Sequence, residues 1–213
     1  MTLPATRWYQ WHAQYDDLHS PDTDRLEVVQ ELIIAALDRA PAGPLTAVSA
    51  CAGQARDLLP VLIHHPRGRD VRARMVELDP LNASFLTAAL GSTDLVGVEV
   101  VIADAGTTDA YIGAVPADLV LLCGVFANIE LDDAQRTVDA ATALCRPGGI
   151  VVWSSYGAQL AHADEVVALF EDRAFERMAL RRSAEREFVV ASHRYVGPQR
   201  SLPAHARFFG FGG

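Results

Sequence analysis

Two carboxylates in this chain lie at the ends of β-rich segments, where a ligand could reach them. Glu77 ends the segment Val71–Glu77, and Asp104 follows the segment 96–103. One carboxylate can accept hydrogen bonds from both hydroxyls of a ribose, and a second can accept the exocyclic amine of adenine. Gly53 follows the earlier apolar segment 45–51 and lets the backbone approach a ligand closely. Together these three positions predict a site for a nucleoside.

The elements that carry these residues alternate regularly from residue 45 onward. Strands are predicted over 45–51, 71–77, 96–103, 117–122 and 150–154, and helices over 56–64, 80–91, 132–144 and 162–170. Such alternation indicates parallel strands joined by crossover helices. A ligand binds beyond the carboxyl ends of such strands, beside the first of them. The sequence therefore places Gly53, Glu77 and Asp104 on one edge of a sheet.

The alternation of strands and helices is interrupted at both ends of the chain. Two β-rich stretches, 177–181 and 188–196, are joined by only a few polar residues, too few for a crossover helix, which predicts an antiparallel hairpin. Ser20 and Pro21 begin an N-terminal helix that ends at Pro41. We expect a doubly wound, seven-stranded, mostly parallel α/β sheet with a C-terminal antiparallel hairpin. Residues 1–44 form an N-terminal aromatic segment and helix, and residues 45–213 form one globular unit.

Composition excludes several classes of protein. All 18 basic residues are Arg, and this absence of Lys excludes a P-loop nucleotide site and a pyridoxal phosphate Schiff base. The net charge of -9 argues against a nucleic-acid partner. The sequence contains no apolar run near the ~20 residues of a membrane helix and no signal-peptide pattern, so we expect a cytoplasmic protein without a membrane partner. The three cysteines lack metal-type spacing, and no metal site is expected.

Several of these segments resemble the motifs of class I S-adenosylmethionine (SAM)-dependent methyltransferases. Residues 48–58 resemble the glycine-rich first motif, 76–80 the ribose motif and 103–105 the adenine motif. Residues 118–126 resemble the strand-four motif, and 144–149 the turn into strand five. The resemblance implies SAM as cofactor and S-adenosylhomocysteine as product. The cofactor-binding residues that it implies are Ala52, Gly53, Glu77, Leu78, Asp104, Ala105 and Cys123.

The chain departs from the first motif of that family at three positions. Its first and third glycines correspond to Cys51 and Ala55, and its leading acid corresponds to Ser49, so only the central Gly53 remains. Cys and Ala are small enough to keep the turn if φ stays negative at both positions. The resemblance implies that the acid helps to hold the amino group of the cofactor. That contact must therefore come from elsewhere or from water.

The methyl acceptor is harder to predict because methyl transfer from a sulfonium needs mainly alignment and removal of water. A general base is not required if the nucleophile arrives deprotonated. The candidate substrate-wall residues are Trp11, Phe126, Asn128 and Tyr156. His12 and Tyr15 are the candidate catalytic groups. The short additions on either side of the sheet favour a small-molecule acceptor, and a homodimer stays open.

The aromatic segment 8–15 has two compatible interpretations. The family resemblance implies an N-terminal segment that closes over the cofactor as a lid. Alternatively, Trp8, Trp11 and Tyr15, spaced by three and four residues, dock a short helix on the core.

The sequence is also compatible with two alternative functions. An NAD-dependent oxidoreductase would use a similar sheet, but the absence of Lys removes the Tyr-Lys pair of short-chain dehydrogenases, and the terminal hairpin also argues against it. The other alternative is a SAM-fold protein that does not methylate, acting as a binding module or steering a cyclisation with SAM as a bound cation. The altered glycine motif keeps this alternative open. Retention of SAM without methyl turnover would distinguish it.

Overall fold

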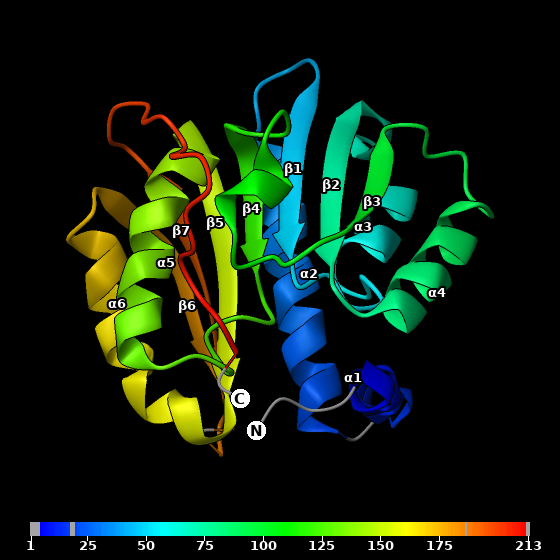
Figure 1. Cartoon of the computed structure of the whole chain (residues 1–213), viewed down its shortest axis with the longest axis horizontal. Helices are drawn as coiled ribbons and strands as arrows, with labels where there is room; N and C mark the ends of the chain where they lie inside the picture. The colour runs from blue at the N-terminus through cyan, green and yellow to red at the C-terminus, as the bar shows by residue number, and fades with distance from the viewer. Residues whose placement is uncertain (1–4, 18–19, 186, 212–213) are drawn as a thin grey trace.

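The computed structural model describes residues 5–17, 20–185 and 187–211, and its centre is a seven-stranded sheet (Figure 1). The strand order is β3-β2-β1-β4-β5-β7-β6. Neighbouring strands are parallel from β3 to β5, whereas β7 runs antiparallel to both β5 and β6. This confirms the predicted fold class. The strands are β1 Leu45–Ala50, β2 Val71–Glu77, β3 Val98–Ile102, β4 Ala117–Leu122, β5 Cys145–Tyr156, β6 Phe175–Arg182 and β7 Phe188–Tyr195.

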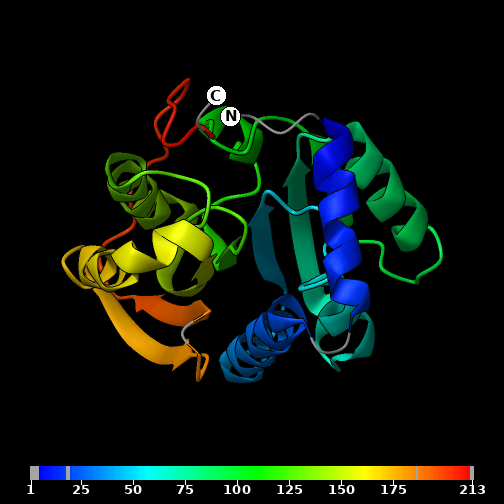
Figure 2. The ribbon, with the colours of Figure 1, turned by 90° about the horizontal axis from the view of Figure 1, so that it is seen from below.

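Helices cover both faces of the sheet (Figures 1 and 2). They are α1 Ala5–Trp11, α2 Pro21–Arg39, α3 Leu59–His64, α4 Pro80–Leu90, α5 Leu131–Leu144 and α6 Ala163–Glu171. The buried residues of α2 and α3 belong to one core cluster, and those of α5 and α6 belong to the other. A 3-10 turn, His12–Asp16, extends α1. None of the described helices has the length and apolarity that a membrane span requires.

The chain enters the sheet through α2, whose start is well defined. The Ser20 hydroxyl accepts a hydrogen bond from the Asp22 backbone N–H at 3.2 Å, and Pro21 occupies the first helical position. This cap satisfies a backbone donor that would otherwise lack a partner. The buried face of α2 includes Val29 and Ile33 and packs on β5 and β7. The cap therefore fixes Arg25, in the second helical turn, near the carboxyl end of β5.

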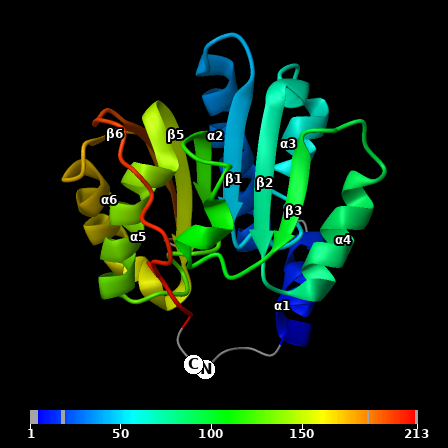
Figure 3. The same ribbon diagram turned by 45° about the horizontal axis from the view of Figure 1, so that its top comes forward.

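The structure places α1 beyond the carboxyl ends of the parallel strands, where the arrowheads of β1 and β2 point (Figure 3). It contacts α4 there, and the ring of Tyr9 lies 6.5 Å from that of Phe85 in an edge-to-face arrangement. The N-terminal aromatic segment is thus docked on the sheet edge that the sequence assigns to ligand binding.

Several predicted boundaries are wrong. Helix α3 begins at Leu59 and not at residue 56, because residues 56–58 form a turn that continues the loop after β1. Strand β3 begins at Val98, since the side chain of Val96 is 99% exposed. Strand β5 begins earlier than predicted because Cys145 already pairs with Ala117 of β4.

The prediction that Phe126 lines the substrate site is not supported by its position. Its side chain is 2% exposed, and its ring lies 5.3 Å from that of Trp153 and 5.9 Å from that of Phe170. These rings, with His193, form an aromatic core between β5 and α6. Phe126 follows β4 as predicted, but its side chain turns into this core because a large apolar ring gains more from burial there.

Candidate active site

A cavity of about 440 Å³ lies at the carboxyl ends of the parallel strands. Its walls come from α1, α2, the loops after β1, β2, β3 and β4, and the segment that follows β7. The described residues that line it include every predicted site residue except Phe126, namely Trp11, His12, Tyr15, Ala52, Gly53, Glu77, Leu78, Asp104, Ala105, Cys123, Asn128 and Tyr156.

Glu77 joins two walls of this cavity. One carboxylate oxygen accepts the Gly53 backbone N–H at 2.6 Å, and the other accepts the Asp79 N–H at 2.7 Å. The side chain is 7% exposed, and burial raises the pKa of its carboxyl group, although these two bonds act in the opposite direction. Each carboxylate oxygen has two lone pairs, so Glu77 can accept further bonds from a ligand while it holds the loop after β1.

Asp79 is the N-cap of α4, because its Oδ1 accepts the Leu81 N–H at 2.8 Å. Its second oxygen, Oδ2, has no hydrogen-bond partner among the described residues. The same is true of Asn82 Oδ1 and His12 Nδ1, and all three residues line the cavity. A buried acceptor without a donor costs about 1–3 kcal/mol. A ligand with hydroxyl donors, such as a ribose, would supply those donors, so this wall fits a nucleoside.

Asp104 is held by a segment that sequence reasoning missed. Its Oδ1 accepts the Gly106 N–H at 2.9 Å, and its Oδ2 forms an ion pair with Arg207 at 2.6 Å. Arg207 reaches this position because the chain after β7 folds back and pairs with Thr107. Beyond it, Phe209 and Phe211 also line the cavity. No local pattern indicates a contact between residues 103 positions apart.

The loop after β1 has a left-handed backbone at three alternate positions. The φ angles are 54° at Cys51, 56° at Gly53 and 49° at Ala55. The condition of negative φ at Cys51 and Ala55 is therefore not met. The Ala52 N–H donates to Val76 O at 2.9 Å and the Ala55 N–H to Ala52 O at 2.7 Å. These bonds hold the glycine-type turn although two of its positions carry side chains.

No protein-family model matches the sequence, and no curated protein sequence matches it. Solved structures do match. An O-methyltransferase family protein from Burkholderia thailandensis superposes with a TM-score of 0.64 at 19% identity, over 82% of this chain and 56% of that one. This chain therefore spans little more than half of that protein's length. A TehB-like SAM-dependent methyltransferase from Corynebacterium glutamicum superposes with a TM-score of 0.61 at 17% identity, over 92% of this chain and 96% of that one.

This is the fold of the class I SAM-dependent methyltransferases. An rRNA methylase from Streptococcus thermophilus shares it, with a TM-score of 0.60 at 12% identity, over 78% of this chain and 95% of that one. Structures with this methyltransferase fold thus include proteins whose names refer to different acceptors. The acceptor of this chain has to be argued from its own cavity.

The left-handed turn of this methyltransferase fold gives a testable expectation at Ala55. A side chain in the left-handed region costs roughly 1–2 kcal/mol, whereas glycine adopts it freely. Ala55→Gly should therefore raise the free energy of unfolding by about 0.5–1 kcal/mol in urea titrations. The matched control is Ala47→Gly, a buried position in β1, which should lower stability. Destabilisation of similar size in both variants would show that Ala55 is not strained.

His12 lies directly on the glycine of this turn. A Cβ added to Gly53 would be 2.4 Å from His12 Nε2, so the imidazole fits only because residue 53 has no side chain. Burial and, secondarily, Arg56 lower the pKa of His12 to about 4, so the ring is neutral at pH 7. A conjugate acid of such low pKa makes His12 a weak base.

Tyr15, Trp11 and Tyr156 surround Arg25, which sequence reasoning did not single out. Arg25 is 4% exposed. It donates hydrogen bonds to the Tyr15 hydroxyl at 2.9 Å and to the Asp22 carboxylate at 2.7 Å. Its guanidinium lies 4.1 Å from the centre of the Tyr156 ring. Trp11 stacks on Tyr156 at 5.9 Å. Burial raises the pKa of Tyr15, so its hydroxyl keeps its proton. In the sequence, the signal that could have revealed Arg25 is an Arg on the otherwise apolar face of α2.

Proposed function

We propose that this protein binds SAM in the cavity and transfers its methyl group to a small-molecule acceptor. The observation that carries the proposal is the Glu77 bridge to Gly53, set beside the unpartnered acceptors of Asp79 and Asn82. It provides close backbone approach and hydrogen-bond acceptors for a sugar, at the position where α/β sheets bind nucleosides. The methyltransferase fold supports SAM as that nucleoside.

Each wall of the cavity has a role in this proposal. Glu77 and Asp79 would hold the ribose, Leu78 and Ala105 would contact the adenine ring, and Asp104 would accept its exocyclic amine. Ala52, Gly53 and Cys123 line the same cavity and would also contact the cofactor. When bound, SAM supplies a methyl group that is already activated by its sulfonium. The chain then has to align the acceptor and exclude water.

The aromatic wall fits that task. Trp11 and Tyr156 are stacked, and Asn128 adds a polar group to the same cavity. We propose that α1 and the turn His12–Asp16 form a lid that brings Trp11 and His12 over the cofactor. In this arrangement His12 and Tyr15 orient the acceptor, because one is a weak base and the other holds its proton. We also propose that this activity takes place in the cytoplasm.

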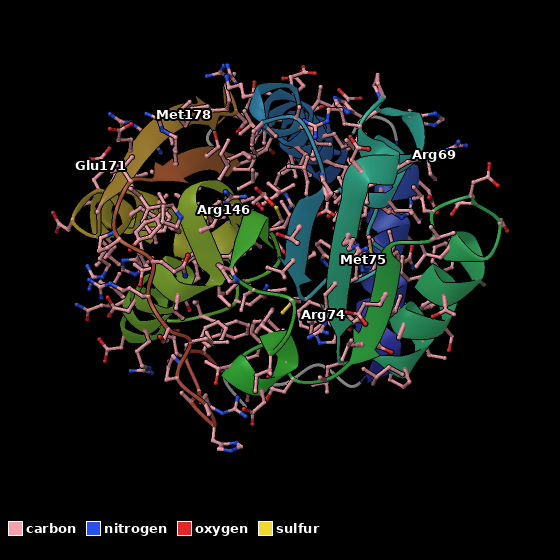
Figure 4. All side chains as sticks on the ribbon, turned by 90° about the horizontal axis from the view of Figure 1, so that it is seen from above. Arg69, Arg74, Met75, Arg146, Glu171 and Met178 are labelled. Carbon is pink, nitrogen blue, oxygen red and sulfur yellow. The ribbon has the colours of Figure 1, made fainter. Side chains whose placement is uncertain are left out.

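Charge supports a small molecule as the acceptor. Arg69, directly before β2, and Arg74, within β2, are labelled in Figure 4, and they pair with Asp94 at 3.1 Å and Glu99 at 2.7 Å. Arg146 pairs with Asp118 at 2.8 Å. These ion pairs neutralise three arginines that lie outside the cavity, and the net charge of -9 disfavours binding of a polyanion. A partly enclosed cavity with aromatic walls suits a compact acceptor.

Calorimetric titration tests the cofactor, and labelled methyl groups test the acceptor. SAM and S-adenosylhomocysteine should bind and NAD should not; tight NAD binding without SAM binding would overturn the proposal. The protein is then incubated with methyl-labelled SAM and separate RNA, DNA, protein and metabolite extracts. Label should appear in the metabolite fraction. Label confined to RNA or protein would refute the small-molecule acceptor, and binding of SAM without any turnover would favour the non-methylating alternative.

A further inference from the structure

The position of the family's missing acid cannot serve the cofactor in this chain. Ser49 lies in β1, where it pairs with Met75 of β2 and Leu121 of β4, and it is 2% exposed. It is not among the described residues that line the cavity. Because the methionine portion of SAM carries an ammonium group, burying that group without a carboxylate or another acceptor would be costly. Another residue of the cavity has to supply the acceptor.

Asp57 is a carboxylate in the same loop, four residues after Gly53, and it lines the cavity. Its Oδ1 accepts the Leu58 N–H at 2.7 Å, and the Cys123 thiol lies near enough to lower the pKa of its carboxyl group. Burial raises the pKa of its carboxyl group, and the positive charge of Arg25 opposes that rise. A cation that entered the cavity beside Asp57 would further stabilise its charged form.

The strand order puts Asp57 at the correct end of the cavity. The order is β3-β2-β1-β4, so Asp104 after β3, Glu77 at the end of β2 and the loop after β1 follow one another along the sheet edge. The proximity of Cys123, which follows β4 and lines the same cavity, places Asp57 on the side of Glu77 away from Asp104. If Asp104 holds adenine and Glu77 holds ribose, the methionine portion extends toward β4. It then reaches Asp57.

On the basis of the proposed SAM site, we infer that Asp57 binds the α-ammonium group of the cofactor, in place of the acid that is missing at Ser49. Arg25 is the neighbouring cation. Its guanidinium has five N–H donors, and its hydrogen bonds to Ser154, Tyr15 and Asp22 do not use all of them. Adjacent negative and positive groups match the zwitterion of an amino acid. Asp57 and Arg25 thus recognise the part of SAM that a plain nucleoside lacks.

Two ligands that differ only in this part test the inference. S-adenosylhomocysteine carries the amino acid group, whereas 5′-methylthioadenosine keeps the adenosine and the sulfur without it. Asp57→Asn preserves side-chain size and the acceptor for Leu58 but removes the charge. In calorimetry it should weaken S-adenosylhomocysteine binding by roughly 10- to 100-fold, the range for a hydrogen bond to a charged group. Its affinity for 5′-methylthioadenosine should change by less than about threefold.

Asp94→Asn is the matched control, since Asp94 lies in an exposed ion pair with Arg69, and it should alter neither affinity. Equal losses for both ligands in Asp57→Asn would mean that Asp57 only supports the loop, and would overturn the inference. If wild-type protein binds neither ligand, the proposed SAM site itself fails. If Asp57→Asn does not fold, Asp57→Ser takes its place. A crystal structure of wild-type protein with S-adenosylhomocysteine provides the direct check, because an ammonium group out of contact with Asp57 would refute the inference.

Discussion

Glu77→Ala is expected to weaken SAM binding by about 2–3 kcal/mol, a loss of roughly 30- to 150-fold in affinity. The proposed bonds from the ribose hydroxyls to the carboxylate are charge-assisted, and they are lost together. The structure adds a second cause. Without the carboxylate, the backbone N–H groups of Gly53 and Asp79 lose their acceptor, so the loop after β1 also loses its position. Calorimetric titration with SAM and S-adenosylhomocysteine measures the effect.

Two further variants separate the ligand contact from general damage to the fold. Glu99→Ala removes an exposed carboxylate of β3 that pairs with Arg74, and it should leave SAM affinity unchanged. Asp79→Ala removes the cap of α4 and should cost about 1 kcal/mol of unfolding free energy. Its effect on SAM affinity should be smaller than that of Glu77→Ala. The reverse ranking of Glu77→Ala and Asp79→Ala in SAM affinity would show that the two acids have been assigned the wrong way round.

Gly53→Ala should impair both the cofactor site and the docking of the N-terminal segment. The residue has a φ of 56°, and its new Cβ would lie 2.4 Å from His12 Nε2. Strain in the backbone and overpacking against the ring each cost on the order of 1–2 kcal/mol. We therefore expect SAM affinity to fall by about 2–3 kcal/mol, and hydrogen exchange to become faster over residues 8–17.

Gly43→Ala is the control for this variant. Gly43 also has a positive φ, 109°, but a Cβ there would meet nothing within 4 Å. It should therefore lower stability through backbone strain alone, with SAM affinity and exchange in residues 8–17 unchanged. Matching results for the two variants would show that backbone strain explains the effect and that the contact with His12 does not matter.

The sequence was sufficient for the order of the elements and for the residues at the strand ends. Buried parallel strands must be apolar along most of their length, and the polar residues that interrupt this pattern mark the ends of the strands. Glu77 and Asp104 could be identified for that reason. Helix starts were equally local, since Ser20 and Asp79 cap the first turns that follow them. The part of the cavity lining at the ends of β1, β2 and β3 follows from these local rules and from the rule that ligands bind at the carboxyl ends of the strands.

The tertiary structure decided what depends on contacts between distant segments. Arg207 meets Asp104 only because the chain after β7 folds back, and Arg25 enters the cavity only because α2 packs on β5 and β7. Phe126 turned into the core because Trp153 and Phe170 offered a larger apolar contact. The left-handed φ of Cys51 is enforced by hydrogen bonds within its loop and to β2. Periodicity and capping specify where an element begins and which of its faces is buried. They do not specify which distant segment packs against that face, because a local sequence pattern carries no signal for long-range contacts.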